Sequence, residues 1–264
     1  MIDKMGDRLK YYEGIEAGRV LIPHLPICVR VDGRAFHTFT RGMKRPYDVD
    51  MSNAMIDTMK YLVEKTDACI GYVQSDEISL ILSDEKDPMF GGRVQKLTSV
   101  IASMATAMFN LVIHRSFPDK PLAEFDCRVW NVPNRTEAAN TILWREFDAT
   151  KNSISMAARA YYSDKQLLGK NSSEKQDMLM EKEVNWNDYP VFFKRGTYAR
   201  RIVVQRKMTP EELANLPEHH EARKNPDLIV TRNEIKDIYM PVFSKVTNRE
   251  AVIFEAAEPI VAEE

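Results

Sequence analysis

Apolar and polar residues in the first half of the chain form short strand-like runs separated by two helical stretches. The strand-like runs are rich in β-branched residues and end in turn-forming ones. They cover 27–31, 69–73, 78–82 and 125–130. Two longer segments, 50–66 and 93–116, carry apolar residues three or four apart, which predicts helices. The resulting order β-α-β-β-α-β is that of a ferredoxin-like split unit, so we expect an α+β fold.

Each predicted helix has a defined start or a defined buried side. Ser52 is expected to cap the first helix, because a serine hydroxyl accepts hydrogen bonds from unpaired amides at a helix start. In the second helix, the residues at helical spacing are expected to face the core. They are Leu97, Ile101, Met104, Met108 and Leu111.

Two acidic motifs follow from this topology. Asp32 ends the first strand, and Asp76 lies in the short turn between the second and third strands. In a β-α-β-β-α-β unit the first two strands run parallel and the second and third form a hairpin. The end of the first strand and the tip of that hairpin therefore meet at one edge of the sheet, where we expect Asp32 and Asp76 to be neighbours.

Neighbouring carboxylates at a sheet edge indicate a metal site. Asp32-Gly33 alone is a common turn dipeptide, but two acidic turns that converge favour shared metal ions over solvated turns. Hard oxygen ligands without clustered histidine or cysteine favour Mg²⁺. Gly33 allows its carbonyl close to a metal or its amide close to a phosphate. Two metals held in this way are used to transfer phosphoryl or nucleotidyl groups.

The pattern changes beyond residue 135. A long helix or two joined helices are expected over 136–162, a polar loop over 163–175 and a short helix over 176–182. The segment 194–207 has six basic residues and no acid, which predicts a hairpin with a basic face. We therefore divide the chain into a catalytic core, 1–135, and a helical extension packed on it, 136–264, with the basic hairpin and a frayed acidic tail from Glu255.

Composition narrows the function classes. The chain has 264 residues and a formal net charge of −2, so a surface that binds nucleic acid must be local. Its three cysteines, all in predicted strands, suit structural thiols in a reducing compartment. The N-terminus has no signal peptide, and the apolar stretch 100–113 is too short to span a bilayer, so we expect a cytoplasmic protein. The sequence has no GxxxxGK phosphate loop and no GxSxG hydrolase pattern.

The two acidic motifs, with their flanking residues 30–39 and 74–79, resemble those of the tRNA-His guanylyltransferase superfamily. The resemblance extends over about the first 200 residues. It includes Lys96, 125–129, Trp144-Arg145, Asn152 and 194–196. Members of that superfamily are nucleotidyltransferases that extend RNA in the 3′→5′ direction. The resemblance implies a polymerase-palm core, tRNA and nucleoside triphosphates as partners, and a homotetramer.

The resemblance also implies roles for individual residues. The catalytic candidates are Asp32, Asp76 and Glu77, with two Mg²⁺ ions held by Asp32, the Gly33 carbonyl and Asp76. GTP or ATP would serve as substrate and for activation of the RNA 5′ end. The nucleotide-binding candidates are Asp32, Gly33, Arg34, Ala35, Phe36, His37, Lys44, Arg45, Ser75, Asp76 and Lys96. The RNA-binding candidates are Arg128, Arg145, Asn152, Lys194, Arg195, Arg200 and Arg201.

One departure from the superfamily pattern bears on specificity. The guanylyltransferases carry the block His-Ile-Asn-Asn-Leu-Tyr-Asn-Thr, and the corresponding segment 150–157 retains only Asn152. This departure is typical of the guanylyltransferase-like branch, whose members repair 5′-truncated tRNAs by templated addition. Two alternatives stay open: a palm-fold nucleotide cyclase or dinucleotide synthase, and a non-catalytic tRNA-binding protein. The sequence does not specify the tRNA or the preferred nucleotide.

Overall fold

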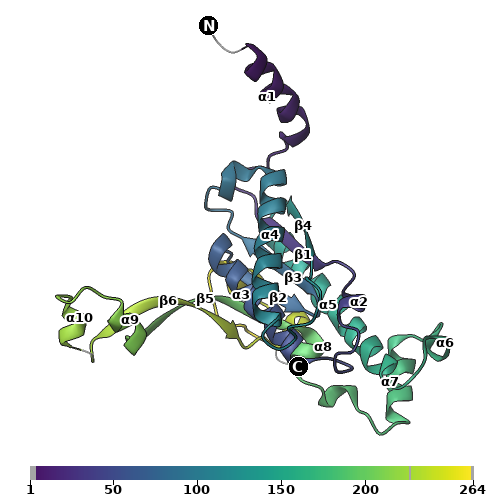
Figure 1. The fold of residues 1–264 in the computed structure, drawn as a ribbon. Coiled ribbons are helices and arrows are strands. Elements are labelled where there is room, and N and C mark those ends of the chain that lie inside the picture. The colour runs from purple at the N-terminus through teal and green to yellow at the C-terminus, as the bar shows by residue number, and fades with distance from the viewer. Residues whose placement is uncertain (1–3, 226, 263–264) are drawn as a thin grey trace.

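The computed structural model describes residues 4–225 and 227–262 and is built on one antiparallel sheet (Figure 1). The six strands lie in the order β4-β1-β3-β2-β5-β6. Their bounds are β1 Ile27–Gly33, β2 Ile70–Gln74, β3 Glu77–Leu82, β4 Phe125–Asn131, β5 Thr197–Lys207 and β6 Ile229–Ile238. Since β1 and β2 each pair antiparallel with β3, they run parallel to each other, as the predicted β-α-β-β-α-β order requires.

Two helices cover one face of this sheet, α3 (Val49–Thr66) and α4 (Val94–Ile113). Their apolar stripes and the alternate strand residues Val29 and Val31 form one core cluster. Asp48, not Ser52, caps α3, because its carboxylate accepts hydrogen bonds from the Asp50 and Met51 amides. The Ser52 hydroxyl instead donates to the Asp48 carbonyl within the first turn.

Helix α4 is buried along a register slightly different from the predicted one. Leu97 and Ile101 are buried as expected, but Leu111 is 63% exposed. Phe109 and Ile113 take the core positions, because they continue the helical face that begins at Leu97. By length and composition alone, α4 could cross a membrane, which differs from the expectation for this stretch; here its stripe packs against the sheet.

The opposite face of the sheet packs against α5 (Arg135–Arg159) and α11 (Arg249–Phe254). The buried carboxylate of Glu146 joins three elements at this interface. It accepts hydrogen bonds from the Tyr198 hydroxyl at 2.7 Å and from the Phe243 amide at 2.8 Å. Burial raises the pKa of Glu146, although both donors oppose the shift.

Three predictions for the second half are wrong. The expected loop 163–175 contains α6 (Asp164–Leu167) and the start of α7 (Ser172–Met180), because Ser163 and Asn171 form capping boxes. The segment 194–207 is not a hairpin: it comprises the end of α8 (Val191–Arg195), Gly196, and β5, whose partner is β6. The acidic tail is anchored as far as it is described, since the Thr247 amide donates to the Ile260 carbonyl.

Gly196 separates α8 from β5 for a steric reason. Its φ of +85° lies in the left-handed region, and a Cβ there would stand 2.5 Å from the Val73 carbonyl oxygen. Beyond this point β5 and β6 extend from the body of the molecule as a two-stranded ribbon (Figure 1). The remaining helices are α1 (Lys4–Ala17), α2 (Phe36–Phe39), α9 (Pro210–Ala214) and α10 (Glu221–Lys224), with 3₁₀ turns at Met89–Gly92, Trp186–Asp188 and Phe243–Lys245.

Candidate active site

The centre of the candidate site is the two-residue turn that joins β2 to β3. Register pairs Gln74 with Glu77, so Ser75 and Asp76 form the whole turn. Ser75 adopts a left-handed φ of +54°, a conformation that is unfavourable for a residue with a side chain. The Gly33 amide donates to the Asp76 carbonyl at 3.1 Å and so ties the turn to the end of β1. The predicted proximity of the first strand's end and the hairpin tip is therefore present.

Gly33 is required here by packing. A Cβ on Gly33 would lie 2.2 Å from the ring of Phe36. That ring is buried among three other phenylalanines, with centroids 5.1 to 5.5 Å away. The aromatic cluster thus presses α2 against the end of β1 and fixes the backbone next to Asp32.

Asp32, Asp76 and Glu77 line a small cavity of about 290 Å³. Burial raises the pKa of Asp76, and the nearby charge of Asp32 raises it further. A cation between these carboxylates would relieve both effects. Within the described residues no group of three His, Cys, Asp or Glu side chains is arranged to hold a metal. Two carboxylates fit Mg²⁺, which takes most of its remaining ligands from water and substrate phosphates.

Glu77 makes a different contact from the two aspartates. Both of its oxygens accept hydrogen bonds from Arg145, at 2.5 and 2.7 Å. The same guanidinium donates to Asp148 at 2.9 Å. Burial raises the pKa of Glu77, and Arg145 opposes that shift. In this structure Glu77 therefore holds Arg145 at the cavity wall, which sequence reasoning did not anticipate.

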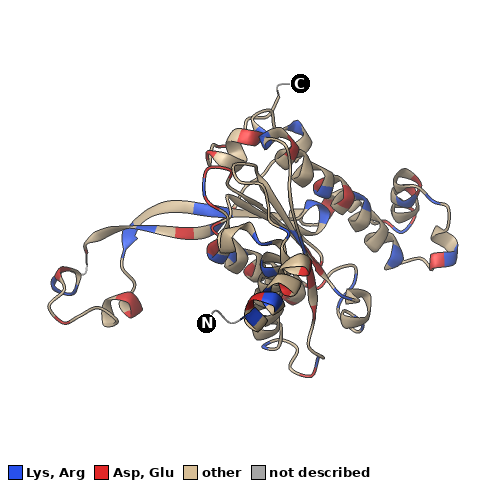
Figure 2. Cartoon of the chain, turned by 90° about the horizontal axis from the view of Figure 1, so that it is seen from above, with Lys and Arg blue, Asp and Glu red and all other residues tan. Residues whose placement is uncertain are grey.

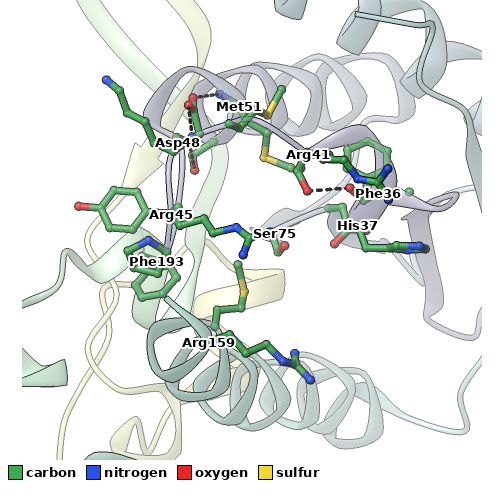
Figure 3. Close-up of a pocket in the computed structure, with 18 of the residues that line it drawn as sticks. Phe36, His37, Arg41, Arg45, Asp48, Met51, Ser75, Arg159 and Phe193 are labelled. Carbon is green, nitrogen blue, oxygen red and sulfur yellow. Dashed lines mark hydrogen bonds between the residues drawn. The ribbon is translucent and has the colours of Figure 1, made fainter. Parts of the chain in front are cut away.

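A larger cavity of about 1020 Å³ adjoins the small one, and Ser75, Asp76, Met156 and Arg159 line both. Its wall is rich in basic side chains. They are His37, Arg41, Lys44, Arg45 and Arg159. In Figure 3, Arg45 reaches into the cavity toward Ser75, and Arg159 lies on the helix that forms the facing wall. A cluster of cations beside two carboxylates can bind a polyphosphate that also coordinates a metal ion.

Not every predicted nucleotide contact reaches this cavity. Ala35, Phe36 and His37 line it with Lys44 and Arg45. Arg34 is exposed and forms an ion pair with Glu124. Lys96 belongs to the first turn of α4, and its ammonium lies 5.0 Å from the centre of the Phe90 ring. The amides of Gly33 and Arg34 donate to carbonyls of the fold, so the first part of the expected phosphate cradle is already used.

The predicted RNA contacts fall into two groups. Arg145 and Asn152 line the small cavity, and Arg128 is exposed on β4. The remaining candidates, near β5, are largely engaged within the fold. Lys194 is buried with a pKa lowered by burial, and its ammonium donates to the Asn187 carbonyl. Arg200 is also buried, whereas Arg201 forms an ion pair with Asp67 at 3.3 Å.

Two basic cavity residues were missed as site candidates, Arg41 and Arg159. The spacing of seven between Arg145, Asn152 and Arg159 carried the signal for Arg159, because it places all three on one side of α5. Nothing comparable marked Arg41, which lies in an irregular segment after α2.

The cysteines lie outside the candidate site. Burial raises the pKa of Cys28 and of Cys69 to about 11, and that of Cys127 to about 12. Cys69 lies just before β2 and not within a strand as predicted. Thiols with raised pKa values are poor nucleophiles, which agrees with a structural role.

Comparison with known proteins shows which family has this fold. A family model described as tRNAHis guanylyltransferase matches residues 6–133. The tRNA(His) guanylyltransferase of Saccharomyces cerevisiae is 30% identical over 211 residues, covering 72% of this chain and 89% of the yeast protein. An uncharacterized protein of Acanthamoeba polyphaga mimivirus is 29% identical over 233 residues, covering 77% of this chain and 79% of its own.

Solved structures give the same family. A bacterial tRNA(His) guanylyltransferase-like protein in complex with ATP superposes with a TM-score of 0.71 at 45% identity, over 75% of this chain and 88% of that one. A structure of the same description in complex with GTP gives a TM-score of 0.70 at 34% identity, over 92% of this chain and 95% of that one.

The fold and these relatives define the class first: the protein is a nucleotidyltransferase. More specifically, the chain belongs to the tRNA(His) guanylyltransferase family. The family predicted from the two acidic motifs is thereby confirmed.

Proposed function

We propose that the protein adds nucleotides to the 5′ end of tRNA in the 3′→5′ direction, in a Mg²⁺-dependent reaction. One observation carries this proposal: the Asp76 turn lies where a carboxylate-lined cavity meets a larger basic one. The first suits metal-bound phosphate and the second suits a triphosphate. A palm-like role for the β-α-β-β-α-β core is part of the same proposal. The ATP and GTP complexes of the bacterial relatives support nucleotide binding.

The residues would divide the work as follows. Lys44, Arg45 and Arg41 would bind the triphosphate of a nucleotide in the large cavity and hold its 3′-hydroxyl toward Asp76. That hydroxyl attacks the activated 5′-phosphorus of the RNA. A bond from its oxygen to phosphorus forms as the hydroxyl proton passes to water, and the bond from phosphorus to the activating group breaks. A 5′-triphosphate end would release pyrophosphate, and an adenylylated end would release AMP.

Asp32 and Asp76 would hold the two Mg²⁺ ions, with the Gly33 carbonyl as a further ligand. When bound, the ions supply charge that favours ionisation of the hydroxyl and departure of the leaving group. Glu77 positions Arg145 at the wall of the small cavity, where its guanidinium faces the approaching phosphate. The enzyme's own cations thus orient both reactants before the bond forms.

The substrate is proposed to be a 5′-truncated tRNA repaired against its 3′ strand. The departure at 150–157 from the guanylyltransferase block supports this choice over dedicated addition of one guanosine. A cytoplasmic location and a homotetramer stay predictions. Helix α1 exposes Leu9, Tyr12 and Ile15 on its surface, which agrees with self-association.

A product assay tests the proposal directly. The protein is incubated with 5′-truncated tRNA, Mg²⁺ and each labelled nucleoside triphosphate, and the extended end is mapped by digestion. We expect growth at the 5′ end that follows the opposing base and stops when the acceptor stem is complete. A cyclic or linear dinucleotide formed without RNA would instead establish the cyclase or synthase alternative. Growth by one guanosine on tRNA-His alone would limit the proposal to tRNA-His maturation.

A further inference from the structure

Next to the candidate active site, three features of the α5-facing side of the sheet lack an explanation within the fold. Arg30 on β1 stands directly opposite Arg128 on β4. Like charges placed opposite each other on neighbouring strands destabilise a sheet. The Arg30 Nε atom is buried without a hydrogen-bond partner. Trp144 on α5 is 54% exposed, although tryptophan normally buries most of its large ring.

These features lie together. The Arg30 guanidinium is 5.7 Å from the centre of the Trp144 ring, and that of Arg145 is 4.6 Å from it. Among the described residues, Arg128 forms one ion pair, with Asp126 at 3.6 Å. Arg30 forms no ion pair with any residue in the described ranges 4–225 and 227–262. An exposed aromatic ring is thus bordered by two guanidinium groups, those of Arg30 and Arg145, and Arg30 has no ion-pair partner among the described residues.

An anion with an attached aromatic group would resolve all three features. A phosphate between Arg30 and Arg128 would remove their repulsion and offer an acceptor to the guanidinium groups. A base stacked on Trp144 would cover the exposed ring, and stacking on aromatic side chains is how proteins bind unpaired bases without strong sequence preference.

The position of the patch relates it to the reaction. Arg30 and Asp32 are two residues apart on β1 and so lie on the same face, roughly 7 Å apart along the strand. Arg145, which follows Trp144, holds Glu77, the register partner of Asp32. The distance of roughly 7 Å between Arg30 and Asp32 is about that between neighbouring phosphates of a nucleic-acid strand. A base on Trp144 therefore belongs to a strand whose neighbouring phosphate reaches the carboxylates.

We propose that Trp144, Arg30 and Arg128 form a stacking platform for an unpaired nucleotide at the acceptor end of the RNA substrate. The platform fixes the end of the strand relative to Asp32 and Asp76. This inference rests on the proposed function for the identity of the RNA. It adds a binding subsite on the sheet surface, separate from the large cavity that accepts the triphosphate.

The test compares Trp144→Ala with Phe147→Ala. Phe147 lies one turn further along α5 and is 49% exposed, but none of the cation–aromatic contacts in the described structure involves it. Binding of 5′-truncated tRNA is measured by fluorescence anisotropy at fixed salt, beside nucleoside triphosphate affinity and oligomeric state by light scattering. We expect Trp144→Ala to weaken RNA binding about tenfold. Trp144→Phe should keep most of the affinity, and Phe147→Ala should match the wild type.

Several results would overturn the platform. They are wild-type RNA affinity in Trp144→Ala, an equal loss in Phe147→Ala, or a loss that accompanies a change of oligomeric state, which would assign the face to a second copy of the chain. Charge is tested separately: Arg128→Ala should lower the slope of log affinity against log salt by about one. If the wild-type protein binds tRNA through Trp144 but does not extend it, the platform stands and the proposed function fails. If Trp144→Ala extends tRNA normally and binds it as tightly as the wild type, the proposed function stands and the platform fails.

Discussion

Two sets of basic residues in this protein look alike in sequence and differ in structure. The cavity set, Arg41, Lys44 and Arg45, lines the large cavity, and no ion pair within the described residues neutralises it. The strand set lies on β5, and each member has an acidic partner. The pairs are Arg200 with Glu258, Arg201 with Asp67, Arg206 with Glu212 and Glu234, and Lys207 with Asp227.

This difference shows that a run of basic residues in the sequence does not reveal how much positive charge is free to bind a ligand in the fold. In the ribbon, basic and acidic residues alternate along β6, which pairs with the basic strand β5 (Figure 2). The acidic partners of the strand set all come from segments outside β5, such as Asp67 at the end of α3 and Glu234 on β6. The cavity set, by contrast, faces a space bordered by Asp76. Unpaired charge is left where a ligand of opposite charge can enter.

The largest effect is expected where the cavity set meets the carboxylates. Asp76→Asn keeps the size of the side chain but removes the charge that would hold a metal ion. We expect the rate of nucleotide addition to fall about 10³-fold. Glu234→Gln makes the same chemical change in the ribbon and should leave the rate unchanged. Single-turnover assays with 5′-truncated tRNA measure both, and comparable losses would erase the distinction between the two regions.

Arg200 should give the next effect, on stability and not on RNA binding. Its side chain is 5% exposed and donates to the Ala257 carbonyl at 2.9 Å and to Glu258 at 2.9 Å. Arg200→Ala leaves the buried Val252 carbonyl and the partly buried Ala257 carbonyl without this donor, which should lower the free energy of unfolding by about 2 kcal/mol. Urea denaturation measures this loss. A variant of wild-type stability with weakened tRNA binding would return Arg200 to the RNA surface.

The fate of Arg200 shows which parts of the site the sequence could predict. Local apolar patterns determine the strands and helices of the first half, so the β-α-β-β-α-β order, and with it the meeting of Asp32 and Asp76, were predicted. The partner of Arg200, by contrast, lies 58 residues further on, in the tail. No local pattern reports such a pairing, and the basic run was therefore interpreted as an exposed hairpin.

The same limit applies to Glu77 and Arg145. Their motif positions were visible, but the bidentate contact depends on how α5 packs across the sheet. Likewise, two capping boxes turned a predicted loop into α6 and α7, since the Gln166 side chain accepts from the Ser163 amide and the Asn171 side chain accepts from the Glu174 amide. The order of helices and strands follows from sequence periodicity, whereas the partner of each charged side chain depends on tertiary contacts.

A smaller effect, on the affinity for the nucleoside triphosphate, should distinguish Arg45 of the cavity set from Arg201 of the strand set. Arg45→Ala removes a cation that reaches into the large cavity. We expect KM for the nucleoside triphosphate to rise about tenfold with kcat little changed, because a charged hydrogen bond to phosphate contributes on the order of 1.5 kcal/mol. Arg201→Ala, whose guanidinium already pairs with Asp67, is the matched control. Equal increases in KM for both variants would show a general loss of positive field.

The smallest effect is expected on the stability of the metal-free protein, through the Asp76 carboxylate beside the cavity set. Burial and the charge of Asp32 raise the pKa of Asp76 above its ordinary value of 3.8. Without metal, the folded state therefore binds a proton here more tightly than the unfolded state. This contribution to stability is fully present below the ordinary pKa and is lost as the pH rises through the raised pKa.

Asp76→Asn cannot ionise and avoids that loss. In EDTA at neutral pH, the variant should be more stable than the wild type by on the order of 1 kcal/mol, and the difference should vanish below about pH 4. Added Mg²⁺ should stabilise the wild type more than the variant, because the ion binds the ionised carboxylate. Urea denaturation at the two pH values, with EDTA or Mg²⁺, measures all four cases. A variant that is less stable in EDTA at neutral pH would mean that Asp76 is stabilised within the fold, like the paired acids of the ribbon, and that no cation is needed to balance it.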